Sequence, residues 1–381
     1  MALPFKRPLR VQPFFGHRSR DRLLLSARAL HAARPGFEQV SRLRAIRTMV
    51  SQFLSSEAHG VRVRLELHGH GEGVLVHEGL TDGEGYVHFD IALDPPWDLP
   101  DEPMWELGTV HWDNRHGPQS TEVRVLAPGC ESRLAVISDI DDTIIETGVT
   151  GGLRSVLRNW RRLFAQLPHE RLAVQGADAF YDELGGGVLA EASQHGAKRL
   201  PATRRPFFYI SSSPWNLFSY LVAFKQVKGL PLGPLKLRDW GLNRKTFGGG
   251  SHGRHKQEAI DSILTMYPDM EFALIGDDTQ GDLPAFARAV RLHPGRIAAV
   301  FLRTVSEHEF TPEEESARDV ISQAGVPLWL GRTYEDGIEF LGALGVTPGG
   351  ETEAIVRTVE QAGESDGSPA HSSVPVQGAK G

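Results

Sequence analysis

The second half of the chain repeats one pattern that strongly restricts its fold. Short, continuous apolar runs alternate there with stretches whose apolar residues have helical spacing. The runs are LAVIS (134–138), FFYIS (207–211), LPLGPLKL (230–237), FALIG (272–276), IAAVFL (297–302) and VPLWL (326–330). Strands that are buried on both faces read as continuous apolar runs. Because helical stretches such as Leu217–Val227 and Leu283–Val290 lie between them, we predict an α/β fold with a Rossmann-like, doubly wound parallel sheet.

The first part of the chain predicts β structure of another kind. The segment Val61–His68 alternates apolar and polar residues, as a half-buried strand does. We predict Arg22–Leu30 as the first strand, and further strands at Tyr86–Leu93, Met104–Trp112 and Thr121–Pro128. Short strands at this spacing favour a small antiparallel β-sandwich. Between the first two strands, Phe37–Leu54 has the apolar spacing of a helix.

These patterns predict three parts of the chain. A β-rich, sandwich-like domain with a helical insertion is expected over 11–128, and the α/β domain over 133–346. A chain of 381 residues is long enough for two such cores. The stretch 347–381 is rich in Gly, Ser, Pro and Glu and has too little apolar surface to order itself. We therefore predict a disordered tail.

The bulk composition indicates the cellular compartment of the protein and restricts the classes of partner that it could bind. The single cysteine excludes an intramolecular disulfide, which fits a reducing compartment. No apolar run has the length of a membrane span or of a signal-peptide core. Up to Arg47 the chain has many basic residues and only two acidic ones, Asp21 and Glu38. Because no nucleic-acid motif accompanies them, we interpret the basic residues as part of a solvated surface. We predict a cytoplasmic protein with no nucleic-acid partner.

Polar clusters follow the predicted strands of the second half. In an open parallel sheet, ligands bind beyond the carboxyl ends of the strands, so these clusters are expected to meet at one edge. The clusters are DIDDT, with Asp139 and Asp141; YISSSPW, with Ser211; GRHKQEAI, with Lys256; and LIGDDTQGD, with Asp277, Asp278 and Asp282. We interpret Ser212 and Ser213 as turn residues before Pro214.

The residue types in these clusters indicate phosphoryl chemistry. Two acidic loops at one edge repel each other unless a cation lies between them, and Mg²⁺ takes oxygen ligands. A lysine adds a fixed positive charge for phosphate. One carboxylate beside the metal can act as a nucleophile that forms an aspartyl-phosphate, and a second one two residues later can act as acid and base. Thr143 can fix the loop by hydrogen bonding.

Taken together, the clusters resemble those of the haloacid dehalogenase superfamily of phosphatases. More narrowly, SDIDDTI, FFYISSSPWNLF, HKQEAI, FALIGDDTQGD and PGRIAAVFLRTV look like the actin-patch type of phosphatidate phosphatase family. The stretch VQPFFGHRSRDRLLLSARAL is similar to the start of the N-terminal β domain of bacterial members. The resemblance extends from Val11 to Val346. A lone DxDxT would mean little, whereas the order of all four clusters is specific.

The resemblance implies a role for each matching position. It makes Asp139 the nucleophile and a metal ligand, Asp141 the general acid and base and a ligand through its carbonyl, Ser211 the phosphate-orienting hydroxyl, Lys256 the charge stabiliser and Asp277 the distal Mg²⁺ carboxylate. Many superfamily members have GDxxxD in the last cluster, whereas here one more residue separates the two aspartates. Whether Asp278 or Asp282 supports the metal therefore stays open.

The activity implied by the resemblance is Mg²⁺-dependent hydrolysis of phosphatidate to diacylglycerol and phosphate. Two alternatives stay open, namely a phosphatase of a soluble small phosphomonoester and a non-catalytic module of the same fold that binds lipid or protein. The segment LRSVLRNWRRLF (Leu153–Phe164) has one apolar stripe with arginines beside it. Such a helix can pack as a cap on the α/β domain, or it can lie on an anionic membrane as a peripheral contact.

Overall fold

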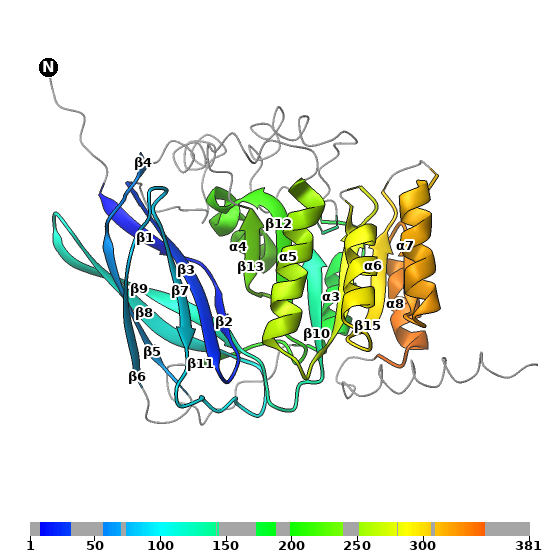
Figure 1. The fold of residues 1–381 in the computed structure, drawn as a ribbon, viewed down its shortest axis with the longest axis horizontal. Coiled ribbons are helices and arrows are strands. Elements are labelled where there is room, and N and C mark those ends of the chain that lie inside the picture. Colours follow the sequence, from blue (N-terminus) through cyan, green and yellow to red (C-terminus); the bar gives the residue numbers. More distant parts are fainter. Residues whose placement is uncertain are drawn as a thin grey trace, which may run out of the picture.

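The structure is a computed structural model with one antiparallel and one parallel sheet (Figure 1). It describes residues 8–31, 56–69, 74–141, 143–144, 173–187, 199–238, 251–279, 281–305 and 309–346. The predicted helices over 37–54 and 153–164 and the predicted tail over 347–381 lie outside these ranges. In the described part of the chain, no helix has both the length and the apolar character of a membrane span.

The antiparallel sheet contains the strands of the first part of the chain. Its strands are β1 (Leu9–Pro13), β2 (Gly16–Arg18), β3 (Arg22–His31), β4 (Ser56–Glu57), β5 (Arg62–His68), β6 (Val74–Leu80), β7 (Tyr86–Ala92), β8 (Met104–Asn114) and β9 (Gly117–Ala127). The order is β1-β3-β2-β9-β8-β5-β6, with β4 and β7 also paired to β3. A late strand, β11 (Arg199–Pro201), pairs with β8. The pairing of β2 with β9 is parallel.

Strict alternation predicts β5 correctly, because Val63, Leu65 and Leu67 are fully buried in the core of this sheet. The prediction that Arg22–Leu30 is the first strand is wrong, since β1 and β2 precede it. Those two strands are short and lie on either side of Phe14 and Phe15, so neither has a long alternating run. Strand β6 was also not predicted. Its apolar residues Val74 and Val76 are exposed, so they do not mark a face that is buried in a core.

The parallel sheet contains all six predicted strands. They are β10 (Leu134–Asp139), β12 (Phe207–Pro214), β13 (Leu235–Arg238), β14 (Glu271–Asp277), β15 (Ile297–Arg303) and β16 (Leu328–Gly331), in the order β13-β12-β10-β14-β15-β16. Strands β13 and β16 begin later than predicted, after Pro234 and Pro327. Proline has no amide hydrogen to donate to a neighbouring strand, which accounts for the later starts.

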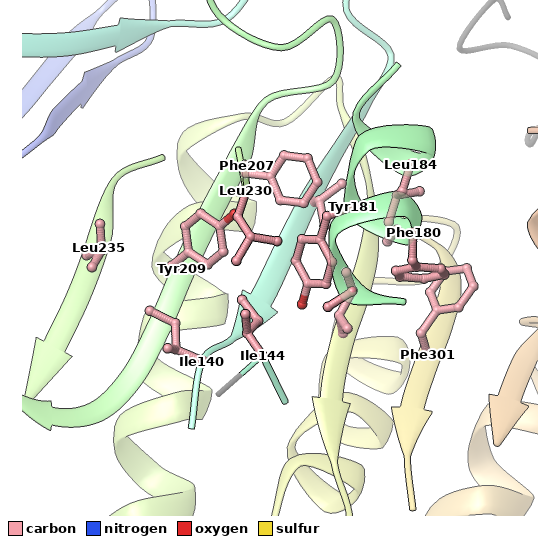
Figure 2. Packing of buried hydrophobic residues seen from close by; sticks show 14 of the residues in the cluster. Ile140, Ile144, Phe180, Tyr181, Leu184, Phe207, Tyr209, Leu230, Leu235 and Phe301 are labelled. Atoms are coloured by element: carbon pink, nitrogen blue, oxygen red, sulfur yellow. The ribbon is translucent and has the colours of Figure 1, made fainter. Parts of the chain in front are cut away.

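Helices cover both faces of the parallel sheet, as predicted (Figure 1). One face packs against α3 (Ala177–Gly185), α4 (Phe218–Val227) and α8 (Tyr334–Ala343), and the other against α5 (Ser251–Met266), α6 (Asp282–Leu292) and α7 (Pro312–Gln323). Along β10, Val136 belongs to the first core and Ile137 to the second. Figure 2 shows the first core, where Phe180 and Tyr181 of α3 lie against the strands.

The two sheets share buried side chains. Phe14 and Tyr86 of the antiparallel part belong to the same apolar cluster as Phe218 of α4. At a second point, His17 Nδ1 lies 2.8 Å from the hydroxyl of Tyr267, just beyond the end of α5. The antiparallel sheet is thereby packed against both the α4 side and the α5 side of the parallel sheet.

Candidate active site

Three buried carboxylates meet at the carboxyl edge of the parallel sheet. Asp139 is the last residue of β10, and Asp277 is the last residue of the neighbouring strand β14. Asp282 is the first residue of α6, which follows β14. One carboxylate oxygen of each lies within 4.8 Å of the others. The topology therefore brings together the acidic loops as the sequence predicts.

Lys256 provides the positive charge of this cluster. Its Nζ lies 2.9 Å from Asp139 Oδ1 and forms a second, shorter ion pair with Asp282 Oδ1. Burial lowers the pKa of Lys256, but the charges of Asp139, Asp282 and Asp277 outweigh burial and raise it above its ordinary value. The side chain is therefore an ammonium ion, although it is only 2% exposed.

Among the described residues, Asp282, and not Asp278, lies beside Asp139 and Asp277. Asp282 Oδ2 accepts a hydrogen bond of 3.0 Å from the backbone amide of Asp277. A Cβ on Gly276 would lie 2.5 Å from the same oxygen, so this approach requires a glycine there. The carboxylate of Asp278 instead accepts a hydrogen bond of 2.9 Å from the amide of Val305. Asp282 therefore belongs to the carboxylate cluster, and which aspartate supports a metal stays a prediction.

The charge balance of the cluster fits a divalent cation. Burial, followed by the charge of Asp282, raises the pKa of Asp277 to about 7, with Lys256 opposing. Burial likewise raises the pKa of Asp139 well above its ordinary range, against the opposing effect of Lys256. One ammonium ion cannot neutralise three carboxylates. A buried set of carboxylate oxygens is what Mg²⁺ takes as ligands, so Asp139, Asp277 and Asp282 fit this ion.

Asp141 is held by two serine hydroxyls of the neighbouring strand. Ser211 Oγ donates a hydrogen bond of 2.6 Å to Asp141 Oδ2, and Ser213 Oγ donates one of 3.0 Å to Asp141 Oδ1. The amide of Ser213 in turn donates to Ser211 Oγ at 2.9 Å. The register of β12 against β13 shifts between Ser211 and Pro214, which is where both hydroxyls turn toward Asp141. The interpretation of Ser213 as a plain turn residue is therefore wrong.

Thr143 and Thr279 fix the two acidic loops. Thr143 Oγ1 lies 3.3 Å from Asp139 Oδ2, as expected of a residue that fixes this loop, and 3.1 Å from Asp277 Oδ2, so it also bridges to the second loop. The amide of Thr279 donates a hydrogen bond of 2.6 Å to Asp277 Oδ1, and its hydroxyl also donates to that oxygen. Thr279 was not singled out from the sequence, although it lies inside the GDDT turn.

Two buried tyrosines support the loop after β10 from the core. The hydroxyl of Tyr181 lies 2.7 Å from Ser138 Oγ, which donates a hydrogen bond of 2.6 Å to the carbonyl of Asp139. The hydroxyl of Tyr334 donates a hydrogen bond of 3.1 Å to the carbonyl of Thr143. Figure 2 shows Tyr181 on α3 between Phe207 and Phe180. No motif marks either tyrosine, so sequence reasoning missed both.

The matching family model covers the part of the chain that contains this site. Residues 134–304 match the model of the catalytic domain of Phosphatidate phosphatase APP1. The chain is 31% identical to Phosphatidate phosphatase APP1 of Saccharomyces cerevisiae over 217 aligned residues. The aligned part covers 57% of this chain and 31% of that protein. It is 25% identical to an uncharacterized protein of Schizosaccharomyces pombe over 173 aligned residues, and the aligned part covers 45% of this chain and 25% of that protein. The chain thus spans about a third and a quarter of these relatives.

Among solved structures, a β-glucuronidase from Ruminococcus gnavus in complex with D-glucaro-d-lactam aligns with 86% of this chain and 54% of its own. The TM-score is 0.24 and the sequence identity 9%. A likeness at this level carries no argument about fold or function. The informative comparisons are the match of residues 134–304 and the identity to the yeast protein.

Proposed function

We propose that this protein is a Mg²⁺-dependent phosphatidate phosphatase of the haloacid dehalogenase type, which releases phosphate and leaves diacylglycerol. One observation carries the proposal. Asp139, Lys256, Asp277 and Asp282 meet in a buried cluster at the carboxyl edge of the sheet, inside the segment 134–304 that matches the catalytic domain of Phosphatidate phosphatase APP1. The 31% identity to the yeast enzyme supports phosphatidate as the substrate.

In this proposal, Asp139 is the nucleophile. Its carboxylate oxygen attacks the phosphorus atom and forms an acyl-phosphate bond, while the bond from phosphorus to the glycerol oxygen breaks. Thr143 holds one oxygen of Asp139 by hydrogen bonding, and Lys256 pairs with the other. These two contacts fix the orientation of the carboxylate before the substrate arrives.

Asp141 serves as the acid and then as the base. In the first step its protonated carboxyl group gives a proton to the leaving alkoxide, and in the second step its carboxylate takes a proton from the water that attacks the phosphorus. The second step restores the Asp139 carboxylate and releases inorganic phosphate. The hydroxyls of Ser211 and Ser213 orient Asp141 for both transfers, because each donates to one of its oxygens.

The remaining cluster residues manage charge. Lys256 faces the nucleophile with its ammonium group, where it stabilises the negative charge of the phosphoryl group. Asp277 and Asp282, together with Asp139, would hold Mg²⁺. When bound, this ion would neutralise the carboxylates and polarise the phosphoryl oxygens. Thr279 keeps Asp277 oriented through its amide and hydroxyl.

A substrate panel tests the proposal. Phosphate release is measured from phosphatidate in mixed detergent micelles and from several soluble phosphomonoesters, with Asp139→Asn as the matched control. We expect turnover of phosphatidate that EDTA stops and Mg²⁺ restores, and none in the control, because an amide cannot form the acyl-phosphate. Turnover of soluble esters alone would indicate a soluble phosphatase, and turnover of neither would indicate a binding module. Full activity of Asp139→Asn would contradict the nucleophile assignment.

A lipid substrate also requires the catalytic edge to approach a bilayer. The segment Leu153–Phe164 lies outside the described residues, so the choice between a packed cap and a membrane contact remains a prediction. If the segment contacts the membrane, replacing Arg158, Arg161 and Arg162 with glutamate should weaken co-sedimentation with anionic vesicles. The same change should slow hydrolysis of vesicle-borne phosphatidate more than that of a soluble ester. Unchanged vesicle binding and an unchanged rate ratio would favour the packed cap.

A further inference from the structure

The antiparallel sheet contacts the segment that directly follows the serines of the candidate site. Ser213 is followed by Pro214 and by the short 3₁₀ helix η1 (Trp215–Leu217), which leads into α4. Only Pro214 and Trp215 therefore separate Ser213 from Asn216. A displacement of Asn216 reaches the serine hydroxyls through a very short piece of chain.

Arg28 of β3 makes the polar part of this contact. Its Nη1 donates a hydrogen bond of 2.6 Å to Asn216 Oδ1. The rest of the guanidinium is fixed inside the antiparallel part, because Nε donates to the carbonyl of Glu84 at 3.1 Å and Nη2 to Glu57 at 3.2 Å. The guanidinium also lies over the ring of Tyr86, 4.5 Å from its centroid. With its other donors engaged, Arg28 presents Nη1 to Asn216 in one orientation.

Phe14, between β1 and β2, makes the apolar part. Its ring centroid lies 4.2 Å from that of Trp215, at an interplanar angle of 31°. It also meets Phe218, the first residue of α4, edge-on at 5.0 Å. Phe15 contacts Phe218 from a second direction at 5.3 Å. Aromatic pairs of this kind add stabilisation beyond the apolar area that they bury, so they help to hold the segment in place.

We infer that the antiparallel sheet positions the Ser211–Ser213 segment, and with it Asp141, through Arg28 and Phe14. Arg28 is then a positioning residue for the reaction proposed above, on which this inference rests. The hydrogen bonds from Ser211 and Ser213 to Asp141 measure 2.6 and 3.0 Å. Hydrogen bonds weaken steeply with misalignment, and misplacing a catalytic group by about 1 Å can cost about a hundredfold in rate.

A mutant cycle tests the role of Arg28 in turnover. The variants are Arg28→Met, Asn216→Ala and the double variant. The control is Arg22→Gln, because Arg22 lies on the same strand and pairs with Asp90 of β7 at 2.6 Å, so this substitution leaves the contact with Asn216 in place. We expect each single variant to lower kcat about tenfold with KM changed less than about twofold, and the double variant to lose no more than either single one. The control should turn over like the wild type.

A purely structural contribution of Arg28 would give a different result. The melting temperature of Arg28→Met would fall while the kcat of the folded protein stayed unchanged. Losses of Arg28→Met and Asn216→Ala that simply add would show that the two residues do not act through one contact. Either result would overturn the inference. If Arg28→Met does not fold, Asn216→Ala removes the same hydrogen bond from the other side and is judged by the same kcat criterion.

Hydrogen exchange separates this inference from the proposed function, since it needs no turnover. In the full-length protein, we expect the peptide covering Ser211 to Phe218 to exchange faster in Arg28→Met than in the wild type or in Arg22→Gln. Unchanged exchange there would overturn the inference even if the wild type hydrolyses phosphatidate. Faster exchange in a protein that hydrolyses no phosphomonoester would leave the positioning contact standing and remove the proposed function.

Discussion

Two lysines of the parallel-sheet part are equally buried but differ in their partners. Lys256 is 2% exposed and pairs with the carboxylates of Asp139 and Asp282. Lys225 of α4 is 1% exposed, and its Nζ has no hydrogen-bond partner among the described residues. The ring of Tyr209 lies 3.5 Å from that nitrogen. Lys256→Met should therefore lower the stability of the protein, whereas Lys225→Met should not.

The magnitudes follow from what each substitution leaves behind. Lys256→Met removes the positive charge from a buried cluster of carboxylates, and breaking such a pair costs about 3 to 5 kcal/mol of unfolding free energy. At the other position, burial lowers the pKa of Lys225 well below its ordinary value, because the ammonium form is costly to bury without a carboxylate beside it. Replacing an unsatisfied buried amine with methionine should leave stability unchanged or raise it by about 1 to 3 kcal/mol.

Equilibrium unfolding in urea measures both changes. Circular dichroism and tryptophan fluorescence are followed in EDTA, so that no divalent cation replaces the missing charge. We expect the midpoint of Lys256→Met to fall clearly and that of Lys225→Met to stay or rise, with the slope unchanged for both variants. An equal fall of the midpoint at the two positions would refute the reasoning. Burial of the aliphatic part of the lysine side chain, and not pairing of its charge, would then decide stability.

Three further predictions concern Mg²⁺ binding, the pH dependence of stability and the loop after β10. Mg²⁺ at about a hundred times its Kd should stabilise the wild type by about 2.7 kcal/mol in thermal unfolding, and Asp277→Asn should lose this shift; an equal shift in both would place the metal elsewhere. Burial, followed by the charge of Lys236, lowers the pKa of His17 to about 3. Because unfolding restores the ordinary value of 6.5, stability should fall by about 1.4 kcal/mol for each pH unit below it until the folded pKa is reached, and His17→Phe should flatten the unfolding profile. Tyr334→Phe removes the hydroxyl that donates to the carbonyl of Thr143, so kcat should fall up to about tenfold with KM unchanged. Unaltered kinetics would show that the tyrosine does not support the site.

The parallel sheet could be predicted from the sequence because its strands are buried on both faces. Each such strand needs a continuous apolar run, and the run remains visible whatever the surroundings. The site followed from the same rule, since the carboxyl ends of parallel strands meet at one edge. Asp139 and Asp277 end neighbouring strands, which places their carboxylates together without any knowledge of side-chain packing.

The choice between Asp278 and Asp282 could not be made in this way. It depends on the path of the turn after β14, where Gly281 has a φ of 77° and α6 begins at the next residue. Gly276 must also lack a side chain, because Asp282 Oδ2 would otherwise lie 2.5 Å from a Cβ. Spacing alone gives neither the turn nor this close approach.

Contacts between the two sheets are the part that sequence patterns describe least well. Arg28 and Asn216 are separated by 188 residues, and no motif connects them. Along β3, Leu25, Ala27 and Ala29 point into the core of the antiparallel sheet, so alternation places Arg28 on the opposite face and predicts that this face is solvated. That face is instead covered by Tyr86 and η1, and Arg28 is only 8% exposed. A pattern of alternation reports which face of a strand meets its own core, but it cannot report what a distant part of the chain places against the other face. Residues that carry chemistry at strand ends can therefore be found from local sequence, whereas residues that position them become visible only when both sheets are seen together.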